Sequence, residues 1–93
     1  MTATPPQSAT LANVASSATS VTLFAASGTV KGRTITNDST AVLYVKFGAT
    51  ASTTSYTVQL ASNAYYEFPQ PCYGGLVDGI WASANGSARV TSW

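Results

Sequence analysis

Short β-prone segments, separated by turn residues at regular intervals, are the feature that most restricts the fold of this chain. Valine, isoleucine, threonine and aromatic residues recur with period-two alternation, which is the pattern of strands with one buried face. No window has the three-and-four spacing of an amphipathic helix. The expected strands are Thr10–Ala15, Thr19–Ala25, Val30–Thr36, Ala41–Phe47, Ser55–Leu60, Ala64–Phe68, Leu76–Ala84 and Ser87–Trp93.

This pattern predicts an all-β fold of about seven or eight short strands. It favours a single small antiparallel β-sandwich or jelly-roll-like domain, with a small barrel as the alternative. A chain of 93 residues is enough for one domain. We expect that domain over residues 10–93, after an N-terminal arm over residues 1–9. Pro5 and Pro6 lack backbone donors, so the arm is either extended toward a neighbour or flexible.

Glycine and asparagine mark the expected turns and one interrupted strand. Asn85-Gly86 is typical of a type I′ turn and predicts a hairpin between Leu76–Ala84 and Ser87–Trp93. The run from Asn37 to Thr40 predicts another turn, because these side chains bond to their own backbone. Gly32 breaks the alternation of its strand, which indicates a bulge or a close backbone approach.

Alternation also predicts which side chains face the core. If Lys46 faces solvent, Val42 and Tyr44 share its side, while Leu43, Val45 and Phe47 face inward. The same rule places Phe24 on the outward side of Thr19–Ala25 and Tyr56 on the inward side of Ser55–Leu60. These are the face assignments used for the candidate binding residues: Phe24, Tyr44, Tyr65, Tyr66, Arg89 and Trp93.

Those six residues are the expected interface because aromatic residues outside a core mark binding or assembly surfaces. Tyr65 and Tyr66 are adjacent, so one of them must point away from the core. Trp93 shares a strand face with Arg89. Such a surface suits a stacked sugar or a protein neighbour, and the low charge favours the protein.

The charged fraction is 8%, against about 25% in typical domains, and the net charge is +1. A neutral surface gives little electrostatic solubility, which is typical of a domain that lives in an assembly or of an extracellular domain with a threonine-rich coat. Four basic residues are too few for phosphate recognition, so no nucleic acid is expected. Lys31 and Arg33 fit a solvated strand face.

No catalytic, metal or cofactor site is expected, and the protein is not predicted to be an enzyme. The chain has no histidine, so Cys72 has no base to activate it and a serine triad is impossible. Asp38 and Asp78 lie in turn-like positions, and Glu67 lies on a strand. No apolar run is long enough for a signal peptide or a membrane span, which predicts cytoplasmic synthesis and no membrane partner.

Three segments carry a resemblance to a known group of proteins. The chain has KGRTITNDSTAVLYVKF from Lys31 to Phe47, YYEFP from Tyr65, and DGIWASANGSARV from Asp78. Together these resemble small virion proteins of tailed bacteriophages and prophages, over roughly residues 18–91. The shared positions are turn and core residues, and none is a catalytic signature.

The resemblance implies a capsid decoration, or cement, protein that braces the junctions between capsomers. It also implies a homo-oligomer, dimer or trimer, whose partners are the major capsid protein or other virion proteins. A head fibre, neck or tail component would have the same sequence features. The alternative function is a carbohydrate-binding or host-adhesion module on the same type of fold.

Overall fold

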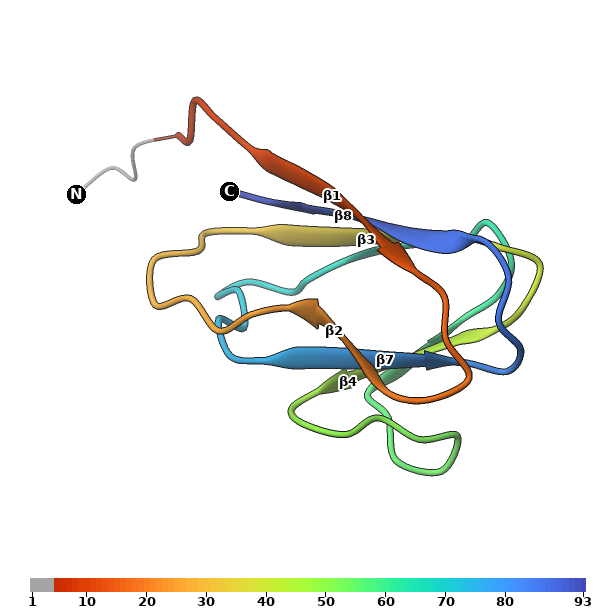
Figure 1. Cartoon of the computed structure of the whole chain (residues 1–93). Helices are drawn as coiled ribbons and strands as arrows, with labels where there is room; N and C mark the ends of the chain where they lie inside the picture. Colours follow the sequence, from red (N-terminus) through yellow and green to blue (C-terminus); the bar gives the residue numbers. More distant parts are fainter. Residues whose placement is uncertain (1–4) are drawn as a thin grey trace.

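Eight strands and no helix form the described part of the chain, residues 5–93 of this computed structural model (Figure 1). Residues 1–4 of the expected arm lie outside the described part. Residues 5–9 are exposed and contain no strand. The predicted all-β class and strand number are confirmed. The strands are β1 (Thr10–Ala15), β2 (Val21–Phe24), β3 (Arg33–Asp38), β4 (Leu43–Phe47), β5 (Val58–Leu60), β6 (Tyr65–Glu67), β7 (Val77–Trp81) and β8 (Ser87–Ser92).

The strands form two four-stranded sheets, as in a small β-sandwich. Sheet A has the order β1-β8-β3-β6, and sheet B has the order β2-β7-β4-β5. Every pairing is antiparallel. Among the described strands, β4 and β5 are the one pair of consecutive strands that are hydrogen-bonded to each other. The other connections carry the chain from one sheet to the other (Figure 1). The edge strands are β1 and β6 in sheet A and β2 and β5 in sheet B.

The core lies between the sheets and follows the period-two alternation. Ile35 in β3 and Val90 in β8 are buried on the inner side of sheet A. Leu43 and Val45 are fully buried on the inner side of sheet B, and Phe47 packs against the same cluster. The predicted inward set of β4 is therefore confirmed. Burying each such side chain stabilises the fold by about 1.5–3 kcal/mol relative to exposure.

The outward orientation predicted for Phe24 is wrong. The pairing of β2 with β7 shifts register between Thr22 and Phe24, which is a β-bulge. A bulge inserts one residue, so the alternation restarts beyond it. Leu23 and Phe24 consequently both face inward, and Phe24 is only 7% exposed, with its ring edge-on to Phe68 at 5.6 Å between centroids.

The hairpin predicted at Asn85-Gly86 does not form, because β7 belongs to sheet B and β8 to sheet A. Gly86 has a φ of +70°, whereas Asn85 does not have the positive φ that a type I′ turn needs. The Asn85 side-chain oxygen instead accepts hydrogen bonds from the N–H and hydroxyl of Thr40, at 2.8 and 2.9 Å. A Cβ at Gly86 would collide with the Asp38 carbonyl. The pair therefore joins the two sheets at one end.

Asn37 lies within β3 and not in the turn predicted to begin there. Its amide nitrogen donates to the carbonyls of Ala41, Leu60 and Ala61 at 2.8 to 3.1 Å. Its oxygen accepts from the Trp81 indole N–H at 3.1 Å and from the hydroxyl of Ser39. A buried amide must satisfy both ends. Asn37 does so by tying sheet A to the turns and strands of sheet B.

Candidate functional site

The six residues expected to form one interface lie in four different parts of the molecule. Phe24 is in the core, and Tyr66 faces inward, where its ring lies 5.5 Å from that of Phe68. Tyr65 and Arg89 are exposed on the outer face of sheet A, and Tyr44 lies on the outer face of sheet B. Trp93 is half-buried at the end of β8. No single surface therefore unites the six.

Trp93 extends the pairing of β8 with β3. Its N–H donates to the carbonyl of Gly32 at 3.0 Å, and its carbonyl accepts from the N–H groups of Lys31 and Gly32. The indole covers Gly32 so closely that an added Cβ there would collide with the ring. The close backbone approach predicted at Gly32 is therefore confirmed, and it fixes the indole at the end of the sheet.

The outer side of sheet A is a continuous surface, which we call the sheet A face. The register pairs Thr34 with Thr91 and Glu67, and it pairs Thr36 with Arg89 and Tyr65. These are the positions opposite the buried residues of β3, so they point away from the core. The sheet A face consists of Leu11, Asn13, Ala15, Thr34, Thr36, Asp38, Tyr65, Glu67, Ser87, Arg89 and Thr91.

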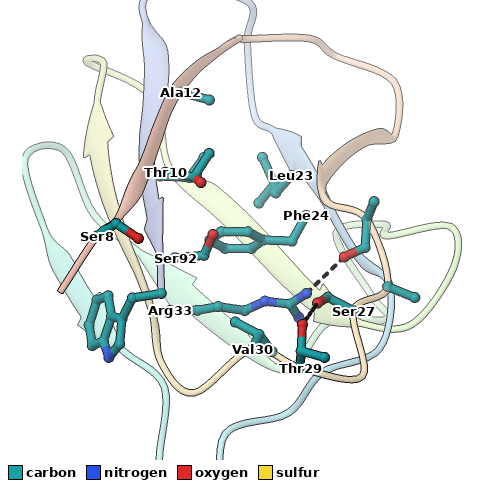
Figure 2. Close-up of a pocket in the computed structure, with 14 residues that line it drawn as sticks. Ser8, Thr10, Ala12, Leu23, Phe24, Ser27, Thr29, Val30, Arg33 and Ser92 are labelled. Atoms are coloured by element: carbon teal, nitrogen blue, oxygen red, sulfur yellow. Dashed lines mark hydrogen bonds between the residues drawn. The ribbon is translucent and has the colours of Figure 1, made fainter. Parts of the chain in front are cut away.

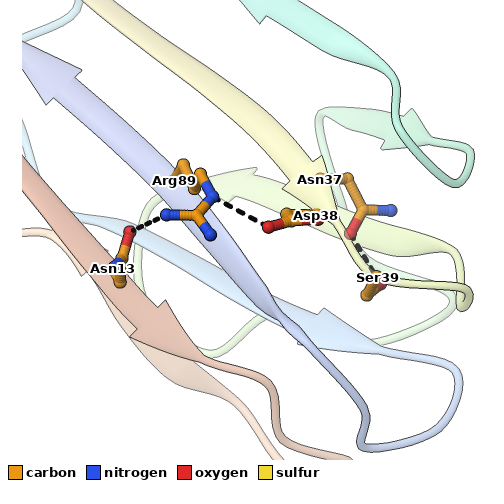
Figure 3. Close-up of polar contacts among 5 residues, drawn as sticks. All are labelled: Asn13, Asn37, Asp38, Ser39 and Arg89. Atoms are coloured by element: carbon orange, nitrogen blue, oxygen red, sulfur yellow. Dashed lines mark hydrogen bonds and ion pairs between the residues drawn. The ribbon is translucent and has the colours of Figure 1, made fainter.

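The charges at the centre of the sheet A face neutralise each other (Figure 3). Arg89 Nε lies 2.8 Å from the Asp38 carboxylate, and the same guanidinium donates to the Asn13 side-chain oxygen at 3.1 Å. These three side chains lie in a row across β3, β8 and β1 (Figure 3). Exposed ion pairs add little stability, roughly 0–1 kcal/mol. The consequence here is that Arg89 and Asp38 cancel, and the face has one net negative charge, that of Glu67 on β6.

The outer side of sheet B is smaller because a loop folds over part of it. Lys46 Nζ donates to the hydroxyl of Ser55 at 2.9 Å, and the N–H of Thr50 donates to the Asp78 carboxylate at 2.7 Å. Ala51, in the same loop, is buried. These contacts hold residues 48–57 against the end of the face that contains Lys46 and Asp78.

The uncovered end of the sheet B outer side holds a pair of tyrosines. The rings of Tyr44 and Tyr56 meet edge-to-face with 5.0 Å between centroids. The Tyr56 hydroxyl donates to the side-chain oxygen of Gln59 at 3.3 Å. Tyr56 was predicted to face inward, but it is 41% exposed, because it belongs to the loop and the strand begins later, at Val58.

A cleft of about 490 Å³ opens between edge strands β1 and β2 (Figure 2). Its size lies within the range of small-molecule sites. Hydroxyl groups from Thr10, Ser27, Thr29 and Ser92 line it, together with apolar side chains. The Arg33 side chain extends below the Phe24 ring in this cleft (Figure 2).

Arg33 is a buried structural cation, and the prediction that it lies on a solvated strand face is wrong. It is 2% exposed, because alternation places it on the inner side of β3 with Ile35. Its guanidinium donates to the carbonyls of Tyr73, Gly75 and Ala25 at 2.8 to 2.9 Å.

The surroundings of Arg33 are aromatic as well as polar. The guanidinium carbon lies 4.8 Å from the centre of the Phe24 ring, a cation–π distance. Nε is buried without a hydrogen-bond partner. Burial lowers the pKa of Arg33, and the neighbouring Cys72 and Tyr73 groups oppose that shift. Since its outer nitrogens are bound to carbonyls, this cation organises the loop before β7.

The residues suited to catalysis or metal binding are dispersed. Within residues 5–93 no group of three histidine, cysteine or acidic residues is placed to hold a metal ion. Asp38 and Glu67 lie on the sheet A face, about 13 Å apart along the strands by their register, while Asp78 lies on sheet B. Burial raises the pKa of the Cys72 thiol, opposed by Arg33, so the thiol is kept neutral.

Leu11 is the exposed residue that the sequence prediction missed. It is 74% exposed on the sheet A face, at the edge opposite Tyr65, which is 60% exposed. The signal was present, because Leu11 alternates with Thr10 and Ala12, which line the cleft, and shares its side with Asn13.

Comparison with known protein families, curated proteins and solved structures finds no match for this chain. Within the described residues, no helix has the length and hydropathy needed to cross a bilayer. The class that the structure defines is a small antiparallel β-sandwich.

Proposed function

We propose that this chain is a non-enzymatic virion structural protein that binds the outer surface of a capsid and reinforces the shell, as decoration or cement proteins do. Its partners are then the major capsid protein or other virion proteins, together with further copies of itself. Its location is the virion, after synthesis in the host cytoplasm. The proposal combines the sequence resemblance with the chemistry of the sheet A face.

The observation that carries the proposal is the sheet A face, with a net charge of only −1 and with exposed Leu11 and Tyr65 at its two edges. Between them lie threonines and the Arg89–Asp38 ion pair. Large apolar and aromatic groups supply most of the energy at protein interfaces, and charge is depleted at interface cores. A face with so little charge, and with that net charge negative, suits a protein surface better than a phosphate backbone.

The size of the sheet A face fits a modest protein interface. Six-residue strands at ~3.4 Å per residue and four strands at ~4.8 Å spacing give a surface of about 20 by 14 Å. A standard interface takes about 800 Å² from each partner. The chain exposes 5205 Å², so that contribution is 800/5205, or about 15% of its surface. The sheet A face itself is about 280 Å² in projection, so residues around its rim would have to supply the rest of that area.

Multivalency supplies the stability that one such contact lacks. Many copies on one shell each form a modest contact, and linked contacts raise the effective concentration of the next. The two arginines do not favour nucleic acid as a partner, because Arg33 is buried and Arg89 is paired with Asp38. Lys46 is bound to the loop over sheet B.

The test is binding of the purified protein to empty capsid shells assembled from the major capsid protein encoded in the same genome. Co-sedimentation over a concentration series should show saturable binding at a fixed copy ratio. A glycan array in the same buffer serves as the comparison. Absence of shell binding would refute the decoration role, whatever the array shows.

The second candidate, a carbohydrate-binding or host-adhesion module, is favoured by Tyr44, Tyr56 and Gln59 on sheet B. Sugar rings stack on exposed aromatic faces, and a nearby amide supplies hydrogen bonds. Here the tyrosine pair lies 5.0 Å apart and Gln59 is within hydrogen-bond distance of Tyr56. This function predicts a positive glycan array signal that Tyr56→Ala abolishes and Tyr65→Ala leaves unchanged.

A further inference from the structure

The edges of the two sheets differ in how they are protected against pairing with another strand. β5 and β6 have three residues each, and β2 has four residues and a bulge. Pro69 and Pro71 follow β6 closely. Short strands, bulges and prolines are the usual protections of sheet edges. β1 is neither short nor bulged: it is six residues long and pairs with β8 in unbroken register, and the nearest prolines, Pro5 and Pro6, precede it.

The backbone groups of β1 that point away from β8 can be assigned from one hydrogen bond. Ser16, directly after β1, donates its N–H to the carbonyl of Gly86 at 3.1 Å. In an antiparallel ladder, hydrogen-bonded pairs occur at every second residue. Thr10, Ala12 and Val14 therefore bond to β8. The N–H and C=O groups of Leu11, Asn13 and Ala15 point out from the free edge.

The side chains of β1 permit self-association. The strand, TLANVA, contains no charge and no proline. The nearest charge on the adjacent strand, Arg89, is already paired with Asp38. A two-fold axis that brings β1 against its own copy therefore brings no like charges together.

We propose that β1 is a self-association edge, where it pairs antiparallel with β1 of a second copy around a two-fold axis at Asn13. Leu11 then lies opposite Ala15 of the second copy, and all the outward backbone groups of Leu11, Asn13 and Ala15 are paired. The two copies share one continuous sheet, so their sheet A faces adjoin. The inference stands on backbone geometry and does not depend on the proposed capsid role.

The contact is small, so the dimer is weak. One strand pair buries less than the ~1,000 Å² expected of a stable interface. We expect reversible association between about 10 μM and about 1 mM, the range of weak complexes. Sedimentation velocity of the purified protein over this range should show a concentration-dependent shift from monomer to dimer.

The decisive variants differ at one backbone position. Asn13→Pro removes the central outward N–H, which the fold does not use, whereas Asn13→Ala removes the same side chain and keeps the N–H. Asn13→Ala should dimerise like the native protein, and Asn13→Pro should remain monomeric at every concentration. Near-ultraviolet circular dichroism checks that both variants retain the native core.

Hydrogen exchange of the native protein provides a readout that needs no variant. The amides of Leu11, Asn13 and Ala15 should exchange more slowly as protein concentration rises, while those of the β5 edge should not change. A native protein that stays monomeric throughout the range refutes the proposal. Two further results would refute it. One is association that persists in Asn13→Pro without protection of the Leu11 and Ala15 amides. The other is protection that appears only when a different protein is added.

Discussion

Removal of the Arg33 guanidinium should destabilise the domain more than removal of any exposed charge. In Arg33→Met the apolar part of the side chain is kept, but the carbonyls of Tyr73, Gly75 and Ala25 lose their donor. Each buried acceptor left unpaired costs about 1–3 kcal/mol. Because some of these carbonyls can regain water when the loop relaxes, we expect a total loss of about 3–5 kcal/mol.

That loss is large for a domain of this size. A stability of roughly 0.05–0.15 kcal/mol per residue gives 93 residues about 5–14 kcal/mol. Urea unfolding followed by tryptophan fluorescence reports it, because Trp81 is buried in the core. With an m-value of about 1–1.5 kcal/mol per molar, the midpoint should fall by about 2–5 M.

Arg33→Lys is the matched control, since it keeps the charge but replaces the planar fork with a single ammonium. It should lose about half as much stability as Arg33→Met, because one ammonium cannot reach three carbonyls on two segments. A midpoint shift below about 1 M in Arg33→Met would refute the reasoning. It would mean that the carbonyls find other partners and that the guanidinium does not hold the loop.

Three further predictions follow from single contacts. Asn37→Asp places a carboxylate against three carbonyls, so the free energy of unfolding, measured by thermal unfolding, should fall by about 3–5 kcal/mol. An unchanged transition would contradict the role of Asn37 in joining the two sheets. Gly86→Ala forces a Cβ into the Asp38 carbonyl at a positive φ, so the free energy of unfolding in urea should fall by about 1–3 kcal/mol. Gly28→Ala is the control and should be nearly neutral, because a Cβ at Gly28 has open space around it. Because burial raises the pKa of Cys72, its thiolate fraction at pH 8 is lowered, and iodoacetamide should alkylate it more slowly than a free cysteine peptide. Equal rates at that pH would contradict this prediction.

The alternation of the sequence predicted the faces of long, regular strands. Leu43 and Val45 are inward and Tyr44 outward, because a strand with no inserted residue keeps its period of two. The same rule failed for Phe24, where one inserted residue reversed the face. A bulge depends on the fit of β2 against β7, and those long-range contacts have no local sequence signal.

The partner of a strand was harder to predict than the strand itself. Asn85-Gly86 has turn chemistry, but local chemistry does not determine which sheet the next strand joins. The sequence also placed Arg33 in solvent, since nothing near it in the chain reveals the carbonyls of Tyr73 and Gly75 that receive it. Long-range pairing and the loop before β7 therefore required the structure.

The central claim, that the sheet A face docks on a protein shell, is tested most directly by two lysine substitutions on opposite faces. Thr91→Lys adds a charge to the sheet A face between Leu11 and Thr34, which are uncharged, and Gln59→Lys adds the same charge to the outer side of sheet B. Binding of each variant to empty capsid shells is measured by co-sedimentation. The account predicts that Gln59→Lys binds like the native protein and that Thr91→Lys binds at least about tenfold more weakly, since burying an unpaired charge costs more than about 1.4 kcal/mol. Equal binding by both variants, or stronger loss in Gln59→Lys, would contradict it.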